Sequence, residues 1–347
     1  MFESLGFETL TAPQAAVWFA LAIGAAFGIL AQITRFCLRR AVVGEDRKAA
    51  AGVWLIALAV AVLGTQAAVA QGLISFADHR FMASDLPVLA IAAGGLMFGI
   101  GMVLTRGCIS RLTVLTGAGN LRAALVLIVF AITAHATLKG VLAPVRTSLG
   151  SVTLPLDSAA LPGNPLLWTA LIAVVALFFA LRSGNKATTL ALAALIGALV
   201  PLAWVGTGFV LYDDFDPIAM QSLSFTSPAA DSIFYTVAST AVSANFGAGL
   251  LGGVVVGALF AALLSGGFEW QSFESPRQTG RYMTGAVLMG LGGVLAGGCT
   301  VGAGLAGVPT LSLAAILALA SIIAGGLLAN RVLRGETSAN TLLHPAE

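Results

Sequence analysis

Long apolar runs recur along the whole chain, and short polar segments separate them. Each run is about 20 residues long, the length that a helix needs to cross a hydrocarbon core of about 30 Å. The alternating ten-residue strands of a membrane β-barrel do not recur. The pattern therefore predicts nine transmembrane helices, at 14–33, 49–71, 86–105, 121–143, 164–182, 187–210, 236–264, 280–297 and 310–331.

Basic residues in the connecting segments predict the orientation of these helices. With the N-terminus outside, only three basic residues are external, namely Arg80, Lys139 and Arg146. The cytoplasmic segments then carry 14: Arg35, Arg39, Arg40, Arg47, Lys48, Arg106, Arg111, Arg122, Arg182, Lys186, Arg277, Arg281, Arg331 and Arg334. This positive-inside asymmetry predicts an external N-terminus and a cytoplasmic C-terminus. Glu3 and Glu8 stand where a secretory signal would carry basic residues, which argues against a signal peptide.

Composition supports a protein embedded in lipid. Hydrophobic residues make up 58% of the 347 residues and charged residues only 9%, against about 25% charged residues in an ordinary soluble domain. The basic residues are scattered over short loops, so no nucleic-acid partner is expected. Cys37, Cys108 and Cys299 form no CxxC or Cys/His pattern, so no disulfide framework, metal site or cofactor is predicted. The expected fold class is an all-α polytopic membrane protein.

Two short apolar stretches, 108–117 and 299–307, do not fit as membrane spans. Each follows a predicted helix, is too short to cross the bilayer and is too apolar for a solvated loop. We expect re-entrant segments, because irregular backbone at membrane depth must be buried in protein or line a cavity. A loop lying along the membrane interface is the alternative.

An internal repeat relates the two halves of the chain. Residues 94–108, GGLMFGIGMVLTRGC, align with residues 285–299, GAVLMGLGGVLAGGC, at a constant offset of 191 residues that matches Cys108 with Cys299. The matched helices are the third and the eighth. Because they are five spans apart, an odd number, the second copy runs through the membrane in the opposite direction. We predict two inverted-topology repeats, 1–160 and 187–347, joined by the connecting helix at 161–186. Such repeats place substrate sites near the midplane, where broken helices meet.

The cysteines and their neighbours suggest an anion path. A lone cysteine in an apolar helix is usually a small buried hydrophobe. Here, however, each cysteine follows the end of a span, and Arg106 and Gly107 precede Cys108 as Gly298 precedes Cys299. Glycine-rich amides, nearby arginines and helix N-termini favour an anion. A neutral, polarizable thiol suits a sulfur-containing anion such as thiosulfate, and weak sites in series permit permeation.

Four segments carry a family resemblance: FCLRRAV at 36–42, GMVLTRGCISRLTVLTGAGNLR at 101–122, QSLSFTSP at 221–228 and GGVLAGGCTVGAGLAG at 292–307. They resemble the YeeE/YedE family of membrane proteins, which includes thiosulfate transporters, and they cover both halves of the chain. The resemblance implies thiosulfate uptake across the bacterial inner membrane, relayed by functional cysteines at Cys37, Cys108 and Cys299. Some relatives work with a small cytoplasmic TusA-like sulfur carrier protein, so such a partner is implied as well.

Differences from the family pattern leave the substrate open. Relatives often have small or neutral residues where this chain has Leu38, Arg39 and Arg40, and bulky Ile109 and Arg111 follow Cys108. Another sulfur or selenium compound is therefore an alternative substrate. The predicted protein is a transporter and not an enzyme. A membrane thiol–disulfide oxidoreductase would need a resolving cysteine close by, and a structural subunit would need no repeat.

Several polar residues within or between the predicted spans have simpler interpretations. His135 is expected to pack or line a cavity, although a proton relay is the functional alternative. Gln66 and Asn245 are expected to hydrogen-bond between helices. The external segment with Asp213, Asp214 and Asp216 leads into 221–228, which we interpret as an ordered loop packed on the bundle, with an entrance gate as the alternative.

Overall fold

A computed structural model describes residues 10–156, 158–213 and 215–343 of the chain. Glu3, Glu8 and Asp214, which entered the sequence predictions, lie outside these ranges. The α-helices are α1 (Ala12–Thr34), α2 (Leu38–Val43), α3 (Arg47–Ala70), α4 (Val88–Leu104), α5 (Ile109–Gly117), α6 (Leu121–Lys139), α7 (Ala143–Gly150), α8 (Pro165–Leu181), α9 (Ala187–Val205), α10 (Thr226–Val237), α11 (Phe246–Leu264), α12 (Pro276–Leu295) and α13 (Leu313–Leu343). Tighter or wider helical turns are η2 (Arg80–Met82), η3 (Gly206–Val210), η4 (Thr300–Gly307) and η5 (Val308–Thr310), and β1 (Asp85–Leu86) pairs antiparallel with β2 (Leu154–Pro155).

Side-chain caps fix where several of the long helices begin. The Asn120 and Asn245 amide oxygens accept hydrogen bonds from the backbone N–H groups three residues on, and the Ser275 hydroxyl oxygen does the same for Gln278. Caps of this kind satisfy N–H groups that the first helical turn leaves without partners. The prediction that Asn245 lies within a span is therefore wrong, because Asn245 caps the start of α11 and does not hydrogen-bond to another helix from within a span.

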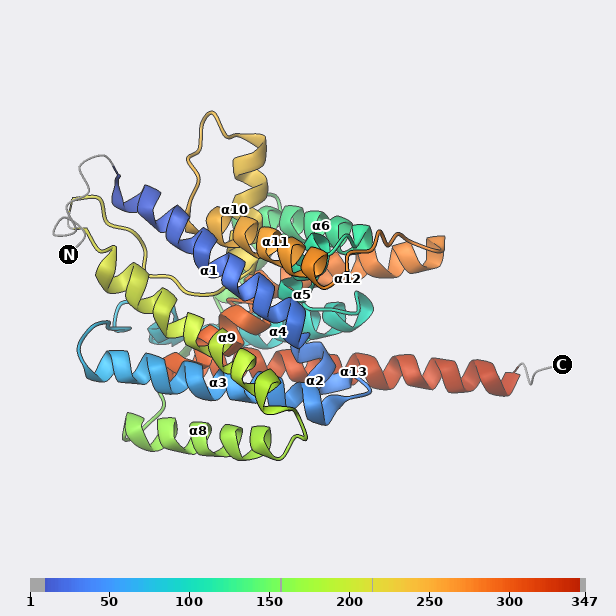
Figure 1. Cartoon of the computed structure of the whole chain (residues 1–347), viewed down its shortest axis with the longest axis horizontal. Helices are drawn as coiled ribbons and strands as arrows, with labels where there is room; N and C mark the ends of the chain where they lie inside the picture. The colour runs from blue at the N-terminus through green and yellow to red at the C-terminus, as the bar shows by residue number, and fades with distance from the viewer. Residues whose placement is uncertain (1–9, 157, 214, 344–347) are drawn as a thin grey trace.

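The protein is a multi-pass helical membrane protein. Eight helices in the described ranges are long and apolar enough to cross a bilayer, and the apolar helix α8, with 17 residues, matches the predicted fifth span. The predicted span 236–264 began too early. Its first ten residues belong to the end of α10 and to a loop, and the spanning helix α11 starts at Phe246. The start of α1 and the end of α13 lie at opposite ends of the bundle (Figure 1).

The centre of the bundle is the crossing of α4 and α12. A Cβ atom placed on Gly101 would lie 2.5 Å from the Gly285 carbonyl oxygen, and one on Gly292 would lie 2.5 Å from the Gly94 carbonyl oxygen. The residue numbers rise along one helix as they fall along the other, so the two helices cross antiparallel. Glycine at these positions lets the two backbones touch, which is how small residues bring membrane helices together.

The remaining helix contacts occur in matched pairs. Helix α1 packs on α11 and α3 packs on α9, and in both pairs the contacting residues rise together along the two helices. Helix α4 packs on α13, and α12 packs on α6. Replacing each helix by its predicted repeat mate converts the contact of α1 with α11 into that of α9 with α3. It likewise converts the contact of α4 with α13 into that of α12 with α6. The inverted repeat stays a prediction, and these paired contacts are what it requires.

The two cysteine-bearing stretches become short buried segments within the bundle. Helix α5 covers nearly all of the predicted stretch 108–117 and packs on α6 and α11. The η4 segment covers the stretch 299–307 and packs on α13 and α3, with all eight of its residues buried. Both segments therefore lie against other helices of the chain instead of in open loops. Gln66, on α3, donates a hydrogen bond of 2.7 Å to the Pro309 carbonyl oxygen in η5, which confirms the expected bond between elements.

Candidate permeation site

Each of the three cysteines follows a helix that ends in the same way. Arg35, Arg106 and Gly297 adopt left-handed backbone conformations, with φ of 54°, 58° and 73°. Each of these residues stands two positions before a cysteine. At the ends of α1 and α4 the N–H group of the next residue also bonds to a carbonyl five residues back, as in a Schellman motif. A left-handed residue turns the chain sharply, so the cysteine comes back toward the bundle and does not extend the helix.

Each cysteine then stands at the start of a new helical segment. Cys37 precedes α2, Cys108 precedes α5 and Cys299 precedes η4, all with extended backbone at the capping position. The Gly302 N–H group donates to the Cys299 sulfur at 3.3 Å. Because the first N–H groups of a helix point toward its start, every thiol lies where amide dipoles favour negative charge. All three thiols are free and buried.

The thiols are linked across the two halves of the chain. Cys37 and Cys108 lie within hydrogen-bonding reach of each other. The Cys108 sulfur is 3.3 Å from the Ser110 hydroxyl oxygen, and the hydroxyl of Thr300 lies beside the same thiol. Thr300 directly follows Cys299 in η4. The three cysteines, far apart in sequence, therefore lie near one another within an apolar bundle.

The arginine nearest the thiols differs from the one singled out in the sequence. Arg106 is exposed, and its role in the structure is to form the turn before Cys108. Arg111, in α5, is close enough to interact electrostatically with both Cys37 and Cys108. Its guanidinium donates to the Ala31 carbonyl oxygen and the Gln32 side-chain oxygen, each at 3.3 Å. Arg111 therefore supplies the positive charge beside the first two cysteines, and a permeation role for Arg106 stays a prediction.

The glycines before the cysteines occupy crowded positions. A Cβ atom on Gly298 would lie 2.8 Å from the Ala303 backbone nitrogen, and one on Gly107 would lie 3.3 Å from the Leu112 side chain. The Thr105 hydroxyl donates to the Gly107 carbonyl oxygen at 2.9 Å and holds this turn in place. Gly298 thus allows η4 to fold back over its own start, and its direct contact with an ion stays a prediction.

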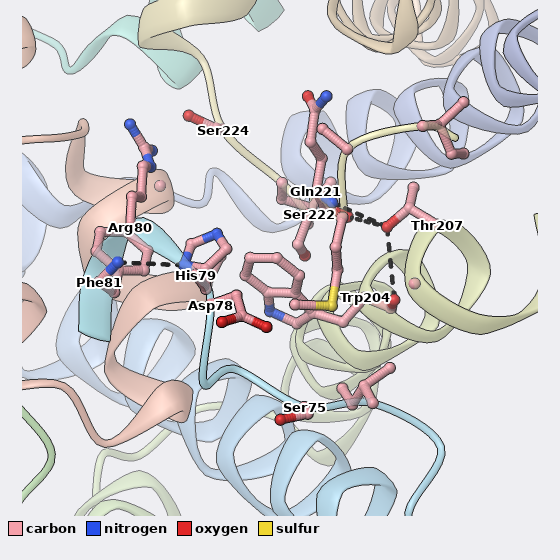
Figure 2. A pocket seen from close by; sticks show the side chains of 18 of the residues that line it. Ser75, Asp78, His79, Arg80, Phe81, Trp204, Thr207, Gln221, Ser222 and Ser224 are labelled. Atoms are coloured by element: carbon pink, nitrogen blue, oxygen red, sulfur yellow. Dashed lines mark hydrogen bonds between the residues drawn. The ribbon is translucent and has the colours of Figure 1, made fainter. Parts of the chain in front are cut away.

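A cavity of about 1000 Å³ leads toward Cys299 from the side predicted to face outward. Figure 2 shows polar and aromatic side chains around it, contributed by the loop after α3, the end of α9 and the segment before α10. Gly302 and Ala306 of η4 line the cavity as well, so it reaches the segment that Cys299 begins. Ser224 meets this segment closely, because a Cβ atom on Gly302 would lie 2.6 Å from the Ser224 hydroxyl oxygen.

The segment 221–228 forms one wall of this cavity. The Thr207 hydroxyl accepts from the Gln221 N–H group at 2.9 Å and lies 2.7 Å from the Gln221 carbonyl oxygen, and the Ser222 hydroxyl donates to the Val200 carbonyl oxygen at 2.9 Å (Figure 2). The side chain of Phe225 is fully buried and packs 5.4 Å from the ring of Phe27. The expectation of an ordered loop packed on the bundle is confirmed.

Among the described residues that line the cavity, Arg80 is the one arginine or lysine. Its guanidinium lies within electrostatic range of Cys299, and burial lowers the pKa of Arg80. An arginine still carries its charge, because its ordinary pKa lies far above neutral pH. Asp78 and Asp231 also line the cavity. An anion that enters therefore meets two carboxylates that repel it and one guanidinium that attracts it.

His79, beside Arg80, is uncharged at neutral pH. Burial and the neighbouring Arg80 lower the pKa of His79 to about 4. The imidazole ring stands edge-on to Trp204, with 5.2 Å between ring centroids, and its Nδ1 accepts from the Phe81 N–H group at 3.3 Å. His79 therefore stiffens the short turn that presents Arg80 without adding charge to the cavity.

The comparisons with known proteins match this architecture. A family model described as sulphur transport matches residues 33–328, which include all three cysteines. The chain belongs to this sulphur transport family. The thiosulfate transporter TsuA of Spirochaeta thermophila is 27% identical over 330 residues, covering 89% of this chain and 96% of the relative. The thiosulfate transporter TsuA of Escherichia coli K12 is 28% identical over 318 residues, covering 82% and 85%.

The sequence reasoning about this family member missed two features of the site. It identified all three cysteines, but it gave no indication that Cys37 and Cys108 would lie close together, because they stand at the starts of separate helices. It also missed Arg80, which stands in the loop before α4 and looked like a minor exception to the predicted charge asymmetry. The segment Asp78-His79-Arg80-Phe81 places charged residues together in a loop between apolar helices. This cluster is the sequence feature that could have identified Arg80.

Proposed function

We propose that this protein takes up thiosulfate, or a closely related sulfur-containing anion, and passes it from Cys299 to Cys108 to Cys37. The observation that carries the proposal is the series of three buried thiols below a cavity that contains an arginine. Membership of the sulphur transport family and the curated names of two relatives support the substrate class.

Thiosulfate suits these groups for a chemical reason. Its terminal sulfur is soft and polarizable, and a neutral thiol can meet it through a weak S–H contact. Its oxygens and its charge are met by backbone N–H groups at the starts of η4 and α5, and by Arg80 and Arg111 at either end of the series. Contacts of this kind are individually weak, and weak sites in series let an ion leave as readily as it enters.

The direction of uptake rests on the predicted orientation. In that orientation the N-terminus and the cavity with Arg80 face outward, while the C-terminus and the basic segment with Arg35, Arg39 and Arg40 face the cytoplasm. Arg40 forms an ion pair with Asp46 and also donates to the Arg35 carbonyl oxygen at 3.0 Å. The pairing with Arg40 lowers the pKa of Asp46, so this pair stays charged at neutral pH. A TusA-like carrier on this face stays a prediction.

The two halves would act as inverted repeats about the crossing of α4 and α12. Under the offset of 191 residues, Arg106 corresponds to Gly297, and both are left-handed. The two glycine contacts at the crossing, Gly101 with Gly285 and Gly292 with Gly94, also exchange under this offset. This agreement supports the units 1–160 and 187–347 with α8 as the connector.

One observation favours thiol–disulfide exchange as a second candidate. Cys37 and Cys108 lie within hydrogen-bonding reach, although no sequence motif pairs them. Both thiols are almost completely buried, at 6% and 1% exposed, so an incoming protein disulfide has no access to either sulfur. Thiol–disulfide exchange requires direct attack on a sulfur atom, which leaves transport as the better supported function.

Growth on thiosulfate tests the proposal. A strain that cannot take up sulfate, carrying this protein, should grow with thiosulfate as its sole sulfur source. Replacing Cys37, Cys108 or Cys299 with Ala should reduce growth while the amount of protein in the membrane stays the same. No growth with the intact protein would remove thiosulfate as the substrate, and full growth of the Cys108→Ala, Cys299→Ala double variant would remove the cysteine relay. Parallel cultures on sulfite and on selenium compounds define the substrate range.

A further inference from the structure

A second, smaller cavity lies beside the main one. Its volume is about 240 Å³, below the roughly 300–1,000 Å³ of pockets for drug-sized ligands. It is enclosed by the loop before α4, the starts of α4 and α13, the end of α12, and α7. Two arginines, Arg80 and Arg146, line it, and none of the described residues around it is acidic. The rest of the wall is apolar, with Phe81, Leu86 and Ile91 among its members.

The two arginines lack carboxylate partners in the described part of the chain. The ion pairs found there join Arg40 to Asp46 and Arg122 to Glu274, and neither involves Arg80 or Arg146. The Nε atom of Arg146 is buried and has no hydrogen-bond partner. Buried polar groups are nearly always paired, so the Nε–H group of Arg146 is a donor that an acceptor in the cavity can satisfy.

Arg80 belongs to both cavities. It lines the main cavity, within electrostatic range of Cys299, and it lines the side cavity with Arg146. Phe81, the next residue, also lines both, and its carbonyl oxygen accepts a hydrogen bond of 2.6 Å from the Ser312 hydroxyl. The short η2 turn is thus a fixed partition between the cavities, and the long side chain of Arg80 extends from it.

We propose that the side cavity is a second oxyanion site, in which Arg146 and Arg80 hold a small tetrahedral oxyanion. Guanidinium groups bind such anions through paired N–H donors, and a mostly apolar wall strengthens the attraction. The oxyanion is either a free sulfate or thiosulfate ion or the phosphate of an anionic lipid, since the cavity lies at the end of the membrane helices. Because one Arg80 serves two cavities, an anion in the side cavity competes with an anion beside Cys299.

Sulfate is the probe for this site, because it has the oxyanion charge but no soft terminal sulfur. Equilibrium binding of radiolabelled sulfate is measured on the purified full chain in detergent, stripped of lipid. Arg146→Gln should weaken binding at least tenfold, the loss expected for a charge-assisted contact, and Arg146→Lys should restore part of it. Lys139→Gln is the matched control, because Lys139 is an exposed cation on the same predicted face and lines neither cavity. Arg146 lies on α7, which has no buried residues, so its substitution leaves the fold intact.

A second arm of the experiment identifies the source of the oxyanion. If phosphatidylglycerol in mixed micelles displaces the sulfate bound through Arg146 and phosphatidylcholine does not, the site holds a lipid phosphate. If neither lipid displaces it and thiosulfate does, the site holds a free ion. Equal sulfate binding by the intact protein and by Arg146→Gln overturns the proposal. Because the readout is binding and not uptake, it stays informative if thiosulfate transport itself fails.

Discussion

The close crossing of α4 and α12 makes Gly101→Ala the most informative single substitution for the fold. A Cβ atom there would lie 2.5 Å from the Gly285 carbonyl oxygen and 2.9 Å from the Met289 backbone nitrogen, both parts of a rigid helix. Real contacts of this kind lie beyond about 3 Å, so the helices must separate by at least about half an ångström. Overpacking of this sort costs about 1–3 kcal/mol.

The helix itself gains from the same substitution. Alanine is favoured over glycine in a helix by about 1 kcal/mol, so the net loss for Gly101→Ala is at most about 2 kcal/mol, and relative to a helix position without a clash it is about 1–3 kcal/mol. Gly292→Ala should cost the same amount, because its Cβ atom would lie 2.5 Å from the Gly94 carbonyl oxygen. The control is Gly252→Ala on α11, where a Cβ atom meets nothing within 4 Å. That variant should be as stable as the parent protein or more so.

Thermal unfolding in detergent at one fixed scan rate measures these differences. Gly101→Ala and Gly292→Ala should each have an apparent Tm a few degrees below that of Gly252→Ala, whose own Tm should be no lower than that of the parent protein. Equal Tm values for Gly101→Ala and Gly252→Ala would show that the two backbones do not touch. A loss at Gly101 without a loss at Gly292 would contradict the symmetry of the crossing.

Three further substitutions test local parts of the account. Gly297→Ala should cost about 1 kcal/mol, because the φ of 73° at Gly297 is left-handed although an added Cβ atom has open space. Arg106→Gly should leave stability equal or higher, because the φ of Arg106 is left-handed as well. A lower Tm for Arg106→Gly together with an unchanged Tm for Gly297→Ala would contradict this account. The pKa of His79 lies near 4 in the folded protein against 6.5 in the unfolded chain, so stability is full above pH 6.5 and falls as the pH drops from 6.5 to 4. Partial exposure reduces that loss to about 1–2 kcal/mol, and His79→Phe should abolish this pH dependence in pH-resolved unfolding. Gln66→Leu removes the donor to the Pro309 carbonyl oxygen and should cost about 1–3 kcal/mol, whereas an unchanged Tm would show that this bond does not stabilise η5.

The apolar pattern sufficed for most of the helices, and its one large error has a physical cause. Residues 238–245 read Ala-Ser-Thr-Ala-Val-Ser-Ala-Asn, which is apolar enough on average to extend a span backward from α11. Ser, Thr and Asn, however, bond to nearby backbone and favour caps and turns over helix interiors. The Asn245 cap makes α11 begin at Phe246, and average hydropathy contains no information about capping.

The contacts at the candidate site could not be predicted in the same way. The repeat identified Cys108 and Cys299, and the family resemblance identified Cys37, but neither reports a distance. Arg35 and Arg106 look like ordinary basic residues at helix ends, and their left-handed conformations appear only in the folded chain. Non-glycine residues rarely adopt this conformation. A prediction from residue type would therefore expect glycine at such a position, which is true of Gly297 but not of Arg35 and Arg106.

Direct transport by thiol-free variants tests the central claim. The intact protein and the Cys108→Ser, Cys299→Ser double variant are reconstituted into lipid vesicles, and the initial rate of radiolabelled thiosulfate uptake is measured. Serine keeps a hydrogen-bonding hydroxyl but removes the polarizable sulfur, so the account predicts at least a tenfold slower rate with the same amount of inserted protein. Equal rates for the two proteins would contradict the cysteine relay.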